Sequence, residues 1–384
     1  MNHVSKGPLA DINRSAVTPF VRQLLCSESA EILDWEYQAL YGGGGDLGAG
    51  LVGIYHFSGH ASDHGQVVPW SLVLKSTQTT GSEDIIDYFT REWFAYHSGF
   101  LGQLSGHIVA PRCFGTSKQP DNLLWIWLEN LVDADEQPWS LESYAQVARH
   151  FGQWNGGYLT GDPLPDYAWF CPSTSREWAL QAAPEIEFLR TSLEHPVIQQ
   201  MYPAGQAQTI LDLWDKRETF FRTLEQLPQT VCHNDAFRRN LFRRHTGDGR
   251  DQTIAIDWAN LGWGAVGEEV ATMVMGNLAF NEVDWTLVAE FTTLMFESYL
   301  DGLRDAGWNG DPRMVRLGFT AAAAMKYSLP YGLQYLCTEE GQAWLGQLLH
   351  QNREEALSGL VEKRAFTLDL ADEARSLMEE LDLR

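Results

Sequence analysis

The first third of the chain carries three short apolar runs with the composition of β-strands. They cover residues 51–57, 70–75 and 123–131 and are rich in β-branched, Leu and aromatic side chains. Between the second and third runs, apolar residues recur at helical spacing over residues 84–100. The pattern predicts a small sheet accompanied by a helix.

The rest of the chain is mostly helical in its pattern. A polar break at residues 133–138 precedes a helical segment at 141–159, and residues 161–228 combine helical patches with many Pro, Trp and acidic residues. A chain of 384 residues is long enough for a small sheet domain and a larger helical one. We therefore expect an N-terminal domain at residues 1–132 and a C-terminal domain at residues 133–384.

A short polar motif stands out in the second half. Asp235 is followed five positions later by Asn240, and Asp257 comes directly after the apolar run 253–256. A Gly-Asp-Gly turn signal at residues 247–249 predicts a strand hairpin that returns Asp257 toward the other two. A carboxylate that orients a hydroxyl, with an amide oxygen and a second carboxylate that bind magnesium, is the set that ATP-dependent phosphoryl transfer uses. The motif favours a nucleotide-phosphate site over a structural turn.

At these positions the chain resembles the aminoglycoside phosphotransferase and choline kinase-like family, whose fold is that of the protein kinases. The family's catalytic loop usually reads His-Gly-Asp-x4-Asn, and this chain has His233-Asn234-Asp235 up to Asn240. The family's magnesium motif matches Ile256-Asp257-Trp258, and residues 264–271 match its Gly-rich turn and helix start. Asn234 stands where Gly is usual, and Asn is the side chain best able to adopt the left-handed backbone that Gly allows.

The resemblance implies an α+β, protein kinase-like two-lobed fold, with a small antiparallel sheet lobe and a large helical lobe. It also implies that Asp235 is the catalytic base and that Asn240 and Asp257 bind Mg²⁺ together with ATP. His233 would support the loop and would not act as a base. Phe237 stands where protein kinases keep a Lys, which disfavours a protein kinase.

A glycine-rich segment precedes the first predicted strand. It contains Gly43-x-Gly45-x-x-Gly48, a spacing that also occurs in dinucleotide-binding folds. In those folds the glycines open a helix, whereas here a strand follows. We therefore expect a hairpin that covers the nucleotide phosphates.

Four further residues are expected to bind the nucleotide. Lys75 ends the second predicted strand, where the kinase fold needs a cation on the phosphates. Glu92 on the following helix is placed to pair with Lys75, and Glu83 is the alternative partner. Glu129 and Leu131 lie at the end of the third strand, where the fold binds adenine through backbone groups. Taken alone, Lys75 is more typical of a solvated strand end and Glu92 of a solvated helix face, and the motif around Asp235 favours the nucleotide-binding interpretation of both. The alternative for Glu129 and Leu131 is a strand end followed by a loop.

Charge and aromatic content bear on the substrate. The net charge of −24 argues against nucleic acid or an anionic membrane surface as a partner, because both require basic surfaces. Residues 257–303 contain eight Asp or Glu and no Lys or Arg, which suits a cationic substrate but is also typical of solvated helix faces. Trp258, Trp263 and Trp285 follow in the same region; such residues more often form a core than an aromatic cage for a cation.

The remaining features of the sequence limit the structural class of the protein and its location in the cell. The chain has no apolar stretch of membrane-spanning length and no signal-peptide pattern at its start, so we expect a cytoplasmic protein. Its five Cys lack disulfide or metal spacing and are expected to be buried small hydrophobes, Cys232 included. Tyr327, Tyr331 and Tyr335 recur every four residues and predict one packed helix face. Nothing in the sequence indicates an oligomeric state.

The sequence favours an ATP-dependent phosphotransferase that acts on a hydroxyl of a small molecule, with a cationic amino sugar or amino alcohol as a candidate. One alternative is a kinase-like nucleotide-binding or scaffold protein without turnover, against which the retention of Asp235, Asn240 and Asp257 speaks. The other is a protein kinase, disfavoured by Phe237 and by the lack of an Ala-Pro-Glu segment after Asp257.

Overall fold

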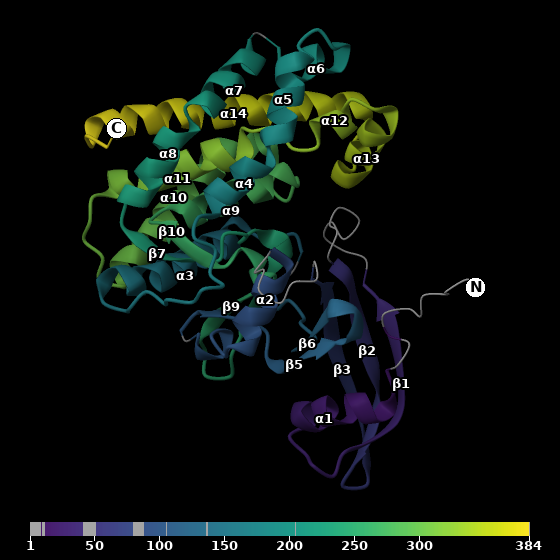
Figure 1. Ribbon diagram of the computed structural model, residues 1–384. Coiled ribbons are helices and arrows are strands. Elements are labelled where there is room, and N and C mark those ends of the chain that lie inside the picture. Colours follow the sequence, from purple (N-terminus) through teal and green to yellow (C-terminus); the bar gives the residue numbers. More distant parts are fainter. Residues whose placement is uncertain are drawn as a thin grey trace. The chain divides into compact units, whose positions relative to one another are not determined.

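The computed structural model describes residues 9, 12–40, 51–79, 88–104, 106–135, 137–203 and 205–383. The chain divides into two compact units (Figure 1). Unit 1 comprises Met1–Ala134 and Phe242–Ala259, and unit 2 comprises Asp135–Leu241 and Asn260–Arg384. Unit 1 is therefore completed by a segment that follows more than a hundred residues of unit 2 in the sequence.

Unit 1 is built on a five-stranded antiparallel sheet in the order β1-β2-β3-β6-β5. The predicted runs 51–57 and 70–75 lie within β2 and β3, and β6 covers most of the run 123–131. The strands are β1 (Glu31–Ala39), β2 (Leu51–Asp63), β3 (Gln66–Gln78), β5 (Cys113–Gln119) and β6 (Leu123–Glu129).

Helix α1 (Arg14–Leu25) covers one face of this sheet. The core between them is aromatic: Phe57 and Trp127 are buried, and Phe20 of α1 stacks on Trp127 with ring centroids 4.9 Å apart. Burying such large rings is the main stabilising contribution of a small sheet domain.

The second part of unit 1 carries the helix predicted at 84–100 and a small sheet. The helix is α2 (Tyr88–His97), and residues 84–87 lie outside the described residues. The short strand β4 (Ile108–Val109) pairs in parallel with β9 (Asp251–Ala255), which lies beside β8 (Leu241–His245). This pairing ties the returning segment of the chain into unit 1.

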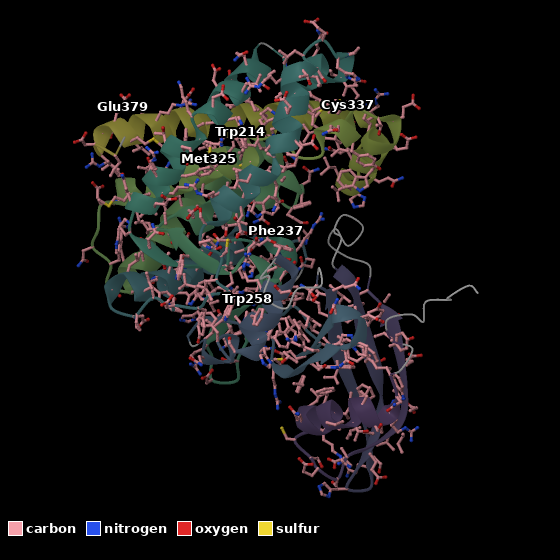
Figure 2. All side chains as sticks on the ribbon, in the orientation of Figure 1. Trp214, Phe237, Trp258, Met325, Cys337 and Glu379 are labelled. Carbon is pink, nitrogen blue, oxygen red and sulfur yellow. The ribbon has the colours of Figure 1, made fainter. Side chains whose placement is uncertain are left out.

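Unit 2 is mainly helical and contains a two-stranded antiparallel sheet, β7 (Gln229–Cys232) with β10 (Gly262–Ala265). Its core is formed by side chains of several helices around α11, where Met325 is fully buried (Figure 2). The helices are α3 (Leu141–Thr160), α4 (Thr174–Gln181), α5 (Ala183–Thr191), α6 (Pro196–Met201), α7 (Gln206–Asp215), α8 (Arg217–Gln226), α9 (Glu268–Ala279), α10 (Val288–Asp305), α11 (Pro312–Tyr327), α12 (Leu333–Leu336), α13 (Glu339–Leu349) and α14 (Arg353–Glu380).

The prediction that Tyr327, Tyr331 and Tyr335 share one helix face is wrong. Helix α11 ends at Tyr327, Tyr331 lies in the following loop, and Tyr335 lies on α12 and is 44% exposed. Pro330 explains the break, because a proline disfavours helical backbone at the residue before it and cannot continue the hydrogen-bond ladder.

The cysteines are only partly as predicted. Cys171 and Cys232 are buried, whereas Cys113 and Cys337 are half-buried and Cys26 is exposed. Cys26 ends α1 with a left-handed backbone at φ 53°, a position at the surface that its apolar character does not explain. Within the described part of the chain, no helix is both long and apolar enough to cross a membrane.

Candidate active site

Three charged side chains meet in unit 1. Lys75 lies on β3, and its ammonium group forms an ion pair with Glu92 of α2. The same ammonium donates a hydrogen bond of 2.9 Å to Oδ1 of Asp257, in the loop after β9. The structure therefore brings together the predicted phosphate cation, its predicted partner and the predicted metal ligand.

This cluster is charged and largely shielded from water. The side chains of Lys75 and Glu92 are 12% and 3% exposed. Burial by itself would lower the pKa of Lys75, but the carboxylates of Asp257 and Glu92 raise it above its ordinary value. A buried ion pair is weak evidence for stability, because taking two charges out of water costs about as much as their attraction returns. Stability alone therefore does not explain the cluster.

Helix α2 also holds the loop that carries Asp257. The carboxylate of Glu92 accepts the backbone N–H of Trp258 at 3.4 Å, and Arg91 donates to the carbonyl of Ala259 at 2.8 Å. Asp257 itself has a left-handed backbone with φ 61°. Contacts on both following residues thus fix a backbone conformation that an Asp adopts at some energetic expense.

The second part of the predicted site lies in unit 2, in the loop between β7 and a short 3-10 turn at Arg238–Asn240. Nδ2 of Asn240 donates to Oδ2 of Asp235 at 2.8 Å and to the Asp235 carbonyl at 3.0 Å. Asn240 is buried and Asp235 is half-buried. Since the amide nitrogen of Asn240 is engaged with Asp235, its amide oxygen is the atom suited to a cation.

The loop before Asp235 is clamped by a buried carboxylate. Glu269, in the first turn of α9, accepts the backbone N–H groups of His233 at 2.7 Å and Asn234 at 3.0 Å. The ring of His233 is fully buried, and its Nδ1 accepts the backbone N–H of Asp235 at 3.2 Å. His233 thus supports the loop, as the resemblance implies. Asn234 has φ 65°, the left-handed backbone expected of a residue in the place of Gly.

Behind the loop, the strand β7 is held by Asn155 of α3. Nδ2 of Asn155 donates to the carbonyl of Val231 at 2.7 Å, and Oδ1 of Asn155 accepts the hydroxyl of Tyr299 at 2.7 Å. Asn155 is fully buried. It supports the strand that leads into the catalytic loop.

The structure places the other residues that were predicted to bind the nucleotide in different ways. Gly43, Gly45 and Gly48 lie outside the described residues. The carboxylate of Glu129 accepts the backbone N–H of Arg112 at 2.8 Å and pairs with Arg244 at 2.9 Å, so this side chain has a structural role. Leu131 is half-buried in the segment after β6. For Glu129, only backbone groups remain candidates for adenine.

The acidic run and the tryptophans divide among several roles. Glu268 is buried and accepts the Ser175 hydroxyl, and Glu282 pairs with Arg239 at 2.6 Å. Trp258 is fully buried, and Trp263 donates to the carbonyl of Pro165. These residues therefore belong to the framework.

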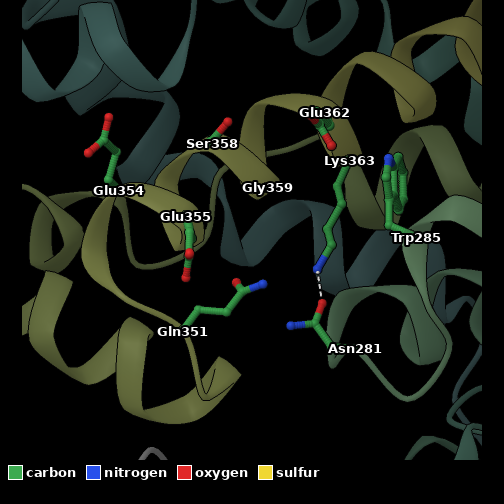
Figure 3. Close-up of a pocket in the computed structure, with 9 residues that line it drawn as sticks. All are labelled: Asn281, Trp285, Gln351, Glu354, Glu355, Ser358, Gly359, Glu362 and Lys363. Carbon is green, nitrogen blue, oxygen red and sulfur yellow. Dashed lines mark hydrogen bonds between the residues drawn. The ribbon is translucent and has the colours of Figure 1, made fainter.

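Trp285 instead lines a cavity of about 470 Å³ beside the N-terminal half of α14 (Figure 3). In Figure 3, Gln351 and Lys363 extend toward Asn281, whose Oδ1 accepts from Lys363 at 2.7 Å. The lining holds more carboxylates than ammonium groups and comprises Asn281, Trp285, Gln351, Glu354, Glu355, Ser358, Gly359, Glu362 and Lys363.

The cavity adjoins a segment that contacts the catalytic loop. Phe280 stacks on Phe237 with ring centroids 5.1 Å apart, and Arg239 pairs with Glu282. Asn281, between these two contacts, lines the cavity. Phe237, which replaces the protein-kinase Lys, is therefore a packing residue that joins the catalytic loop to the end of α9.

Each unit holds one oxygen ligand of the kind that a hard cation prefers. Across the described residues, no three His, Cys, Asp or Glu side chains are grouped to hold a metal ion. Magnesium bound with a nucleotide needs only one or two protein oxygens, because phosphates and water supply the rest. The amide oxygen of Asn240 and the carboxylate of Asp257 are groups of that kind.

Sequence reasoning missed the supporting residues of the catalytic loop. Glu269 lies in the segment 264–271, which matches the start of a helix, but its position in the sequence does not show that it binds the backbone of residues 233 and 234. Lys326 of α11 contacts the same loop, and its only sequence signal is a lysine that ends an Ala-rich apolar run. Neither contact follows from local spacing.

Comparison with known proteins identifies the fold. Residues 127–311 match the model of the phosphotransferase enzyme family. No curated protein sequence matches the chain. The chain is similar in structure to a choline kinase from Cryptosporidium parvum Iowa II, with 10% identity, a TM-score of 0.54, and coverage of 96% of this chain and 97% of the other. It is also similar to the amicoumacin kinase hAmiN, with 15% identity, a TM-score of 0.52, and coverage of 90% and 96%.

The protein thus has a kinase-like fold, with a sheet-based N-terminal part and a larger helical part. Over residues 127–311 its resemblance to the phosphotransferase enzyme family is confirmed.

Proposed function

We propose that the protein is an ATP-dependent kinase that transfers the γ-phosphoryl group to a hydroxyl of a small molecule. The observation that carries the proposal is the arrangement of Asp235, whose carboxylate is held by Asn240 in a loop fixed by Glu269. The match to the phosphotransferase enzyme family supports the same chemistry. The two structural neighbours are kinases named for small molecules, which supports a small-molecule acceptor.

In this proposal Asp235 orients the acceptor hydroxyl and takes its proton as the oxygen attacks the γ-phosphorus. The bond from that phosphorus to the β–γ bridging oxygen breaks, and ADP leaves. Asn240 and Asp257 would hold Mg²⁺, which neutralises charge on the phosphate oxygens. Lys75 binds phosphate oxygens and Glu92 orients Lys75. Phosphoryl transfer depends mainly on positioning and charge neutralisation, so these groups suffice.

We further propose that the acceptor is a cation bound at the cavity beside α14. The support is its excess of carboxylates, the half-buried indole of Trp285 in its lining, and its adjacency to the segment that packs on Phe237. Carboxylates and an indole face both attract ammonium groups.

The kinase proposal is tested by ATP consumption with a panel of amino sugars, amino alcohols and neutral polyols. With the best acceptor, Asp235→Asn should lower kcat by about 10²- to 10⁴-fold. Affinity for ATP, measured by calorimetry on the same preparation, should change little. Near-normal turnover of Asp235→Asn would remove Asp235 from the mechanism, and ATP binding without turnover of any acceptor would favour a protein that binds nucleotide silently.

The acceptor proposal has its own test. Glu354→Gln combined with Glu362→Gln should raise KM for a cationic acceptor and leave KM for ATP unchanged. Glu297→Gln, which alters an exposed carboxylate on α10, is the matched control. The kcat/KM of the cationic acceptor should also fall as salt rises, because screening limits exposed charges to about 8 Å at physiological ionic strength. A neutral best acceptor without that salt dependence would refute the cationic assignment and leave the kinase proposal standing.

A further inference from the structure

Lys326 is a buried lysine in unit 2 to which the proposed mechanism gives no task. It is the penultimate residue of α11, and only 6% of it is exposed. Lysine is almost never buried without a partner, because its ammonium group loses strong hydration. The contacts of its Nζ atom therefore indicate why it is there.

The main contact of Lys326 is with the catalytic loop. Its Nζ donates a hydrogen bond of 2.6 Å to the backbone carbonyl of Asn234, the residue before Asp235. Nζ also lies 3.3 Å from Oγ1 of Thr272, and that hydroxyl donates to the same Asn234 carbonyl at 3.2 Å. Charge-assisted bonds such as the first are about twice as strong as neutral ones.

These bonds complete the restraint on one peptide group. The carbonyl of the Asn234–Asp235 peptide is held by Lys326 and Thr272, and its N–H is held by Nδ1 of His233 at 3.2 Å. A peptide group is planar, so fixing both ends fixes its rotation. That rotation sets the direction in which the side chain of Asp235 leaves the backbone.

The surroundings of Lys326 are consistent with a fixed cation. Its Nζ lies 4.9 Å from the ring centroid of Trp178, within the range of a cation–π contact. Burial lowers the pKa of Lys326, and the charges of Asp235, Glu269 and Glu268 oppose that shift.

We infer that Lys326 is a positioning residue for the proposed phosphoryl transfer: by binding the carbonyl of Asn234, it holds the Asn234–Asp235 peptide in the orientation that aims Asp235 at the acceptor hydroxyl. This inference rests on the proposed function for its catalytic consequence. The restraint on the loop itself does not depend on which acceptor is used. Lys326 touches neither reacting atom and acts through the backbone of the loop.

The experiment compares Lys326→Met, which keeps the length of the side chain but removes the charge and the donors, with Lys326→Arg, which keeps both. Lys326→Met should lower kcat by about 10- to 100-fold, because small displacements of a reacting group have effects of that size. KM for ATP and for the acceptor should stay within about twofold of the unchanged protein, since neither binding site is touched. Lys326→Arg should recover a substantial part of kcat. Lys216→Met, at an exposed lysine between α7 and α8, is the control for loss of a lysine.

Two further measurements keep the outcome clear. Amide hydrogen exchange of residues 233–235 needs no substrate, and Lys326→Met should accelerate it at least about tenfold. If the unchanged protein phosphorylates no acceptor, the proposed function fails, and exchange alone then decides whether Lys326 restrains the loop. If Lys326→Met does not fold, Thr272→Val, which removes the other donor to the same carbonyl, should lower kcat several-fold. A normal kcat in Lys326→Met, or in Thr272→Val if Lys326→Met does not fold, would overturn the inference. A rise in KM without a fall in kcat, or unchanged amide exchange of residues 233–235, would also overturn it.

Discussion

The substitution of Asn234 tests why an asparagine can stand where the family usually has glycine. Asn234 has φ 65°, which is costly for most side chains, and its own side chain makes two bonds within the site. Nδ2 donates to the carbonyl of Cys232 at 3.4 Å and to the carbonyl of Asn260 at 3.2 Å. Gly would accept the backbone but lose both bonds, and Ala would lose both bonds and strain the backbone.

The magnitudes follow from these contacts. Both bonds are long, so each is assigned the low end of the usual range, about 0.5 kcal/mol. An Ala with left-handed backbone adds roughly 1 to 2 kcal/mol. A Gly avoids that strain but has more freedom in the unfolded chain, which adds about 0.5 to 1 kcal/mol. We therefore expect Asn234→Gly to lower the free energy of unfolding by about 1.5 to 2 kcal/mol, and Asn234→Ala by about 2 to 3 kcal/mol.

Urea unfolding followed by far-ultraviolet circular dichroism measures these differences. Asn122→Gly is the matched control, because Asn122 also has a left-handed backbone, φ 59°, but is exposed; it should change stability by less than about 1 kcal/mol. A Gly variant as stable as the unchanged protein would show that the two side-chain bonds contribute nothing. Equal stability of the Gly and Ala variants would show that the left-handed backbone at this position is not maintained.

Three other expectations follow from the site and its supports. Asp257→Ala should abolish the magnesium-dependent part of ATP affinity, because it removes a carboxylate ligand from a site with few others; a calorimetric titration that shows unchanged affinity would place the metal elsewhere. Burial raises the pKa of Glu269 from 4.5 to about 7. Between these two pH values the native protein therefore binds more protons than the unfolded chain. The stability that results is fully present below pH 4.5 and is lost as pH rises through 7. Unfolding measured at several pH values should show a slope of up to about 1.4 kcal/mol per pH unit that Glu269→Gln removes, and identical slopes in the two proteins would contradict the assignment. Gly267→Ala should destabilise the protein by more than about 2 kcal/mol, because φ is 94° and the added Cβ would lie 2.0 Å from the carbonyl oxygen of Val315; Gly307→Ala, with φ 89° and open space, is the control and should lose less.

The placement of Asp235 and Asn240 on one loop was predictable from sequence because both belong to a short motif with a fixed spacing. Asp235 and Asn240 are five residues apart, and their hydrogen bond follows from a local turn. The pairing of Lys75 with Glu92 required the resemblance to the kinase fold, because the two residues come from separate elements whose packing no local pattern encodes.

The supports of the loop could not be predicted in the same way. Lys326 meets Asn234 across 92 positions of the chain, and Asn155 meets Val231 across 76. Such contacts depend on how several helices pack, and a buried Lys or Asn has the same sequence appearance as a solvated one. Helix periodicity also failed locally at Tyr331, where Pro330 interrupts a pattern that the spacing alone would continue.

The discontinuity of unit 1 has a consequence for how the protein is made. Ribosomes release a chain from its N-terminus, and domains generally fold as they emerge. A nascent chain that ends at Ala134 already contains the five-stranded sheet, but it lacks β9, which pairs with β4, and Asp257, the second of the two carboxylates that pair with Lys75. Unit 1 therefore cannot complete its structure until residue 259 has been synthesised, and by then most of α3 to α8 has left the ribosome. Folding of unit 1 is therefore completed only when synthesis of unit 2 is well advanced, and an isolated N-terminal fragment would expose the unpaired edge of β4 and leave Lys75 with Glu92 but without Asp257.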